Sequence, residues 1–183
     1  MKRKILVGLG VVLLIAIGYI GFTLLTTRSH SPSQTAEISN GDLNIKVVYC
    51  QPYKKGRMIF GTKEDGALQP FGEYWRLGAN EATEITISKA INFAGSPLPA
   101  GTYRMYAVPG ATTWKVGLNS ELGKWGAMEP DYTKDVLKVE VPAGNAPSET
   151  EQFTINLTKS DDGVNMDFVW DKTSVRVPIT PAE

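Results

Sequence analysis

The feature that most limits the fold is a repeated alternation of apolar and polar side chains after residue 42. A period of two places every second side chain on one face, as in a β-strand that buries one side. The alternating runs lie at residues 43–49, 85–87, 103–107, 114–118, 137–141, 153–157, 164–170 and 175–179. We therefore predict an all-β fold over residues 41–183, an antiparallel β-sandwich of jelly-roll type. The last four runs have short connections, and we expect them to form a meander.

The N-terminal part of the chain predicts a membrane anchor. Residues 5–25 contain no charged side chain, and a helix of about 20 apolar residues can cross a bilayer core. Three basic residues in segment 1–4 precede this run, which places the N-terminus in the cytoplasm. We expect a single transmembrane helix in the inner membrane, a polar tether over residues 26–40, and a domain on the periplasmic side. A cleaved signal peptide is the alternative, although no small-residue cleavage site follows the run.

Composition excludes several classes of function. Cys50 is the only cysteine and His30 the only histidine, so the domain cannot form an internal disulfide or use serine–histidine or cysteine–histidine catalysis. Four of the 19 basic residues lie before residue 30 and all 19 acidic residues lie after it, so we expect no nucleic-acid partner. The oxygen-bearing residues Asn80, Glu81 and Asp131 lack the spacing of a calcium loop. We predict no metal and no cofactor.

The stretch 75-WRLGANEAT-83 concentrates polar and aromatic side chains in a long irregular region. It has two interpretations. In the first it is a scaffold, with Trp75 in the core, Arg76 paired with Glu81 or another carboxylate, Asn80 bonded to backbone, and Gly78 at positive φ. In the second it is a binding site. There, Arg76 acts with Arg57 as a fork for a carboxylate, phosphate or sulfate, and Trp75 or Trp125 offers a stacking face.

Several ordered motifs resemble the bacterial domain family DUF2911. They are 55-KGRMIFG-61, 70-PFGEYWRLGANEAT-83, 98-LPAGTYRMYAVPG-110, 114-WKVGLN-119, 123-GKWG-126 and 133-TKDVLKVEV-141. The resemblance extends from about Tyr49 to Ile179. It implies a compact, mainly β domain that is commonly exported, and it implies no particular activity, substrate or cofactor. Its signature positions include Arg57, Arg76 and Trp125 here, which adds weight to a site at these residues.

We therefore expect a membrane-anchored, non-catalytic binding module for a small anionic ligand, a glycan or an envelope protein. The candidate ligand-binding residues are Arg57, Trp75, Arg76, Asn80, Glu81 and Trp125. One alternative is a hydrolase that uses Glu81 and a second carboxylate, for which Glu73 and Glu84 are the nearest in sequence. The other is a purely structural or assembly domain. The sequence does not indicate an oligomeric state.

Overall fold

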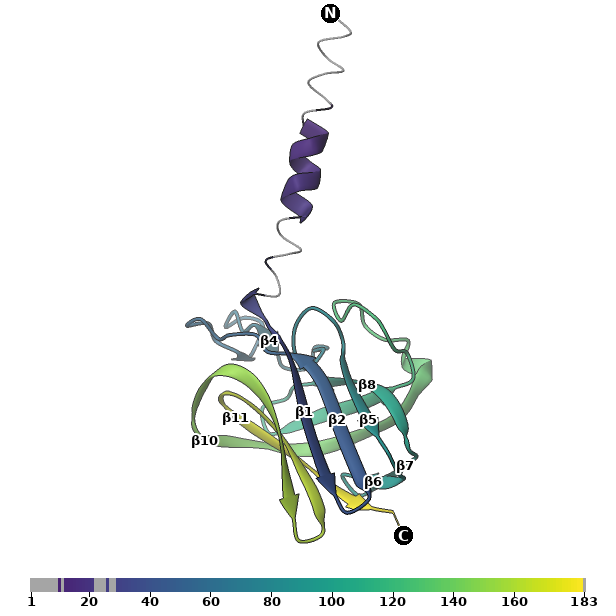
Figure 1. Cartoon of the computed structure of the whole chain (residues 1–183). Coiled ribbons are helices and arrows are strands. Elements are labelled where there is room, and N and C mark those ends of the chain that lie inside the picture. Colours follow the sequence, from purple (N-terminus) through teal and green to yellow (C-terminus); the bar gives the residue numbers. More distant parts are fainter. Residues whose placement is uncertain (1–9, 11, 22–25, 27–28, 183) are drawn as a thin grey trace, which may run out of the picture.

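The computed structural model describes residues 10, 12–21, 26 and 29–182, and most of these form one antiparallel β-sheet (Figure 1). Its nine strands are, in spatial order, β1 (Ser33–Asn40), β2 (Leu43–Cys50), β5 (Thr83–Ile87), β8 (Gly101–Val108), β9 (Thr113–Asn119), β10 (Asp135–Ser160), β11 (Gly163–Pro181), β6 (Ile91–Phe93) and β7 (Ser96–Leu98). Two short parallel strands, β3 (Phe60–Gly61) and β4 (Gln69–Pro70), and a 3-10 helix, η1 (Tyr132–Lys134), lie in the loops. The predicted mainly antiparallel β architecture is confirmed.

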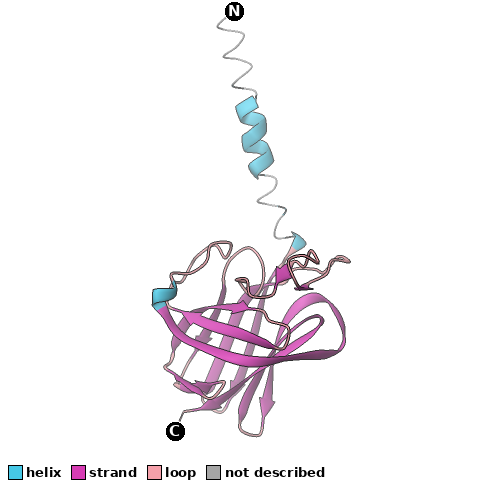
Figure 2. Cartoon of the chain, turned by 180° about the vertical axis from the view of Figure 1, so that it is seen from behind, coloured by secondary structure: helices cyan, strands magenta, loops and turns pink. Residues whose placement is uncertain are grey.

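The structure differs from the prediction in how the layers connect. β10 has 26 residues and β11 has 19, and each joins two of the predicted strands into one. The first part of β10 pairs with β9 and the later part with β11, with register shifts between Asn145 and Thr154. Instead of a four-stranded meander and two stacked sheets, there is one continuous sheet whose long strands curve around the core (Figure 2). The apolar–polar alternation is interrupted where β10 bends, although β10 pairs with β11 on both sides of the bend. The sequence pattern therefore suggested two strands where the backbone forms one.

The predicted polar tether over residues 26–40 is wrong for its second half. Ser33–Asn40 form β1, which pairs with all of β2 from Ser33↔Cys50 to Asn40↔Leu43. The two strands are joined by a two-residue turn in which Gly41 has a φ of 61°. Only Ala36 and Ile38 of β1 pack against the core, so hydrogen bonding to β2 holds this strand more than burial does. A weak alternation of this kind is easily mistaken for a linker.

Part of the predicted transmembrane segment 5–25 lies outside the described residues. Residues 12–21 are helical, whereas the structure does not describe residues 1–9, 11 and 22–25. Among the helices that are described, none has the length and apolar character needed to cross a bilayer.

The core is organised around an aromatic cluster. Trp75 is 2% exposed, and its ring centroid lies 4.9 Å from that of Phe153 and 5.7 Å from those of Trp114 and Trp170. Phe60, from β3, packs against the same group at 5.5 Å from Trp75. Because Trp75 and Phe60 belong to the long 51–82 connection, this cluster fixes an irregular segment against the sheet.

We expect Trp75→Ala to lower the free energy of unfolding by about 3–5 kcal/mol, because it leaves a cavity among four aromatic rings. Urea unfolding of the full-length protein in detergent, followed by far-UV circular dichroism, measures this change. Trp125→Ala is the matched control, since Trp125 is 43% exposed, and we expect it to cost less than about 1 kcal/mol. Equal losses in the two variants would contradict the central role of Trp75.

Candidate functional site

A pocket of about 480 Å³ lies between the start of β1, the loop after β2 and the 75–83 segment. Three basic side chains, Lys55, Arg57 and Arg76, line it together with His30. None of its lining residues is acidic. The pocket therefore has a strongly cationic wall, and we call it the cationic pocket.

Lys55 and Arg57 are presented by a tight turn. Lys55 and Gly56 have φ values of 50° and 69°, and the Arg57 amide donates to the Lys54 carbonyl at 3.1 Å. Two consecutive left-handed residues are typical of a type I′ turn, which favours glycine at its second central position. The turn therefore places a lysine and an arginine on either side of a glycine.

Acidic residues of β10 and β11 hold this turn by its first lysine. Lys54 Nζ lies 2.5 Å from a Glu149 oxygen and 2.7 Å from an Asp171 oxygen. Glu151 accepts the Lys54 amide through its carbonyl and the Lys55 amide through its side chain. The nearby carboxylates thus bind Lys54 and the backbone, and they leave Lys55 and Arg57 to line the pocket.

The two arginines are held by backbone carbonyls rather than by carboxylates. Arg57 donates from Nε to the Lys54 carbonyl at 2.9 Å and from Nη2 to the Tyr53 carbonyl at 2.5 Å. Arg76 donates from Nη1 to the Asn80 carbonyl over a long 3.4 Å. Within the described part of the chain, neither arginine has a carboxylate oxygen within 4 Å. Both guanidinium groups therefore keep donors for a ligand.

Arg76 is a partly desolvated cation. Burial lowers its pKa, and the neighbouring charge of Arg104 lowers it further, while Tyr74 and Cys50 act in the opposite direction. Arg104 is itself buried under the 119–134 loop, where its Nη2 donates to the Tyr74 hydroxyl at 2.6 Å. An arginine stays protonated in proteins, so an anion bound at Arg76 would offset two neighbouring positive charges.

The 75–83 segment itself is mainly scaffold. Trp75 exchanges two 2.8 Å backbone hydrogen bonds with Ala107, and its indole donates to the Gly78 carbonyl. Gly78 has a φ of 153°, and a Cβ there would lie 2.8 Å from the Cys50 carbonyl oxygen, so only glycine fits. The predicted positive φ is confirmed, as is backbone bonding by Asn80, whose amide donates to the Ser31 carbonyl. Trp75 as a stacking face is wrong, because its ring is buried.

Glu81 and Trp125 belong to a second pocket of about 460 Å³. Glu84 and Lys124 also line it, and Glu84 accepts the Gly123 amide at 2.7 Å. Glu81 accepts a 3.4 Å contact from the buried Cys50 thiol. Burial, followed by this contact, raises the pKa of that thiol. Arg76 is not paired with Glu81, so that part of the scaffold interpretation is wrong.

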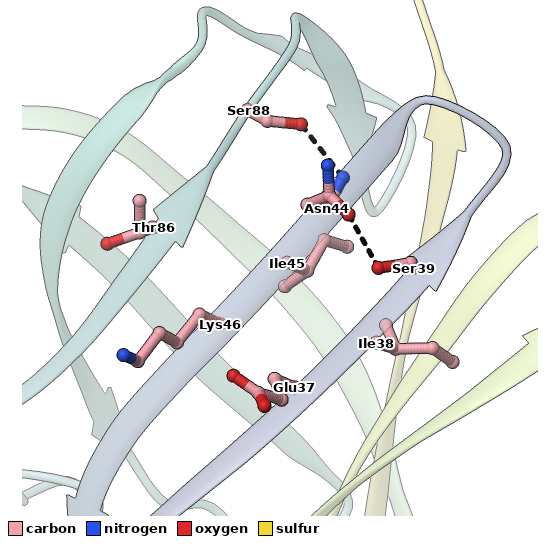
Figure 3. A pocket seen from close by; sticks show the side chains of 8 residues that line it. All are labelled: Glu37, Ile38, Ser39, Asn44, Ile45, Lys46, Thr86 and Ser88. Carbon is pink, nitrogen blue, oxygen red and sulfur yellow. Dashed lines mark hydrogen bonds between the residues drawn. The ribbon is translucent and has the colours of Figure 1, made fainter.

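A third hollow lies on the outer side of β1, β2 and β5 (Figure 3). Its polar groups largely satisfy one another. The Ser39 hydroxyl donates to the Asn44 side chain, and the backbone amide of Asn44 donates to the Ser88 hydroxyl. Glu37 and Lys46 are direct cross-strand neighbours. This hollow combines both signs of charge and does not resemble a site for one ligand.

The structure thus brings Arg57 and Arg76 together in the cationic pocket, with Asn80 bonded to Arg76 beside it. Trp75 is buried in the core, and Glu81 and Trp125 line the second pocket. The structure also adds two residues that sequence reasoning did not choose as site residues, Lys55 and His30. The turn pattern Lys-Lys-Gly-Arg could have indicated Lys55. His30 was assigned to the tether, and it reaches the pocket because β1 begins only three residues later.

These features define a small antiparallel β domain with a cationic pocket formed by its irregular loops. The chain belongs to the family described as "Protein of unknown function (DUF2911)", whose model matches residues 31–179. The match begins just before β1, so the domain includes the strand that composition assigned to a tether. No curated protein and no solved structure matches the chain.

We expect Gly56→Ala to destabilise the protein by about 1 kcal/mol, because a side chain at φ 69° is strained even though space is free around it. Gly144→Ala is the control, since Gly144 has neither a positive φ nor a close contact. Thermal unfolding of the two variants, measured side by side, tests the turn. A neutral Gly56→Ala would contradict the left-handed conformation.

Proposed function

We propose that the domain binds a small anionic ligand in the cationic pocket and catalyses no reaction on it. One observation carries this proposal: Lys55, Arg57 and Arg76 line a single pocket that no carboxylate shares. Lys55 and Arg57 are exposed, but Arg76 is half-buried, and a half-buried cation without a paired carboxylate is costly in a fold. A bound phosphate, sulfate or carboxylate would offset that cost, and the planar arginine forks suit such oxyanions.

We further propose that residues 5–25 anchor the domain in the inner membrane, with the N-terminus in the cytoplasm and the domain on the periplasmic side. The uncharged run of 21 residues and the basic residues before it support this location.

We expect inorganic phosphate to bind the full-length protein in neutral detergent, with an enthalpy measurable by isothermal titration calorimetry. Loss of one charged hydrogen bond costs about 1.5–3 kcal/mol, so Arg57→Gln and Arg76→Gln should each weaken binding about 10- to 100-fold. Lys115→Gln, a charge-matched change at an exposed site outside the pocket, should leave affinity unchanged. Arg76→Gln should also leave the unfolding free energy nearly unchanged, and a loss of several kcal/mol would instead indicate a structural role.

A second candidate function is favoured by the other pocket, where Glu81, Glu84 and the exposed Trp125 lie together. An aromatic face beside carboxylates suits a sugar ring, either bound or hydrolysed. We expect Trp125→Ala and Glu84→Gln to abolish any glycan retention on an array of envelope polysaccharides, while Arg57→Gln leaves it intact. If only Arg57→Gln had an effect, the second pocket would have no such role.

A further inference from the structure

The cationic pocket lies where the chain enters the domain. His30 and Ser31, which line it, come directly before β1. The start of β1 and the loop region that contains β4 lie at one end of the sheet, and the C-terminus lies at the other (Figure 1). The pocket is therefore at the end of the domain nearest to the N-terminal apolar run along the chain.

The length of the connection limits how far the pocket can be from that run. The run ends at residue 25, and residues 26–30 lead to His30; these five residues span at most about 18 Å when fully extended. Each headgroup layer of a bilayer is about 5–8 Å thick. A tether over residues 26–40 would have allowed about 50 Å, but β1 takes up most of its length. The connection also carries Arg28 and no acidic residue.

The pocket is larger and more apolar than a bare anion needs. Besides its cations it is lined by the accessible side chains of Tyr53 and Leu68, with the buried Pro52 and Trp170 beneath them. Its volume of about 480 Å³ lies in the range of sites for small organic molecules. Such a wall suits a phosphate ester whose organic group has both an apolar carbon surface and hydroxyl groups.

We propose that the ligand is the phosphate of an anionic lipid headgroup, presented by the same membrane in which the chain is anchored. This inference rests on the proposed anion-binding function and on the proposed membrane anchor. Lys55, Arg57 and Arg76 bind the phosphodiester, and the apolar wall contacts the glycerol. Anionic lipids attract basic groups close to the bilayer surface, so the short connection gives the pocket a high local concentration of ligand.

The test uses the full-length protein in nanodiscs of phosphatidylcholine, with and without phosphatidylglycerol, and hydrogen–deuterium exchange of peptides that cover residues 53–57 and 76–80. We expect about tenfold slower exchange in the anionic discs, as for a site filled at ten times its dissociation constant. The double variant Arg57→Gln/Arg76→Gln should lose this protection. The control Lys115→Gln/Lys159→Gln, which removes the same charge elsewhere, should keep it. Inorganic phosphate added to neutral discs forms the second arm.

Each outcome decides between the sources of phosphate. Protection by anionic discs that only the arginine variant loses supports the lipid ligand. Protection by inorganic phosphate but not by anionic discs overturns the lipid source and leaves the anion-binding function intact. Protection by neither overturns both proposals. Loss in the control variant as well would show general charge attraction, and failure of the full-length protein to enter nanodiscs would remove the anchor on which the inference depends.

Discussion

The packing of Trp75 is the interaction on which the rest of this structure depends. Its ring lies among Phe60, Trp114, Phe153 and Trp170, and its backbone pairs with Ala107 of β8. In an extended segment, successive side chains point to opposite sides. Burial of Trp75 therefore leaves Arg76 on the opposite side, where it lines the cationic pocket. One apolar contact in the core fixes the position of one charge at the surface.

The distribution of carboxylates is the second element of the design. Glu149, Glu151 and Asp171 all engage Lys54 or the backbone of its turn. They give the turn rigidity without neutralising the side chains that face the pocket. The same principle holds for Arg57, which is oriented by carbonyl oxygens. The two guanidinium groups are thus positioned by neutral carbonyl oxygens, while the carboxylates hold Lys54 and the backbone of its turn.

Part of this could be predicted from sequence. The strands with clear alternation, such as 43–49 and 114–118, correspond to β2 and β9, because burial of one face leaves a period of two. The polar β1 was missed, since its pairing depends on backbone hydrogen bonds that any side chain permits. The strands β6 and β7 were missed because three residues are too few to show a period of two. Arg57 and Arg76 were expected to act together and do line one pocket. The separation of Glu81 and Trp125 from them depends on loop geometry, which spacing along the chain does not encode.

The position of β1 at the margin of the sheet has a practical consequence for work with the isolated domain. A truncated chain that starts at residue 41, where the polar composition ends, would leave the edge of β2 that faces β1 with unpaired amides and carbonyls, while the other edge still pairs with β5. An uncovered strand of this kind recruits other chains and promotes aggregation. The same truncation would remove His30 and Ser31 from the pocket. A soluble fragment should therefore begin before residue 30, and insolubility of shorter fragments would reflect the missing margin rather than an unstable core.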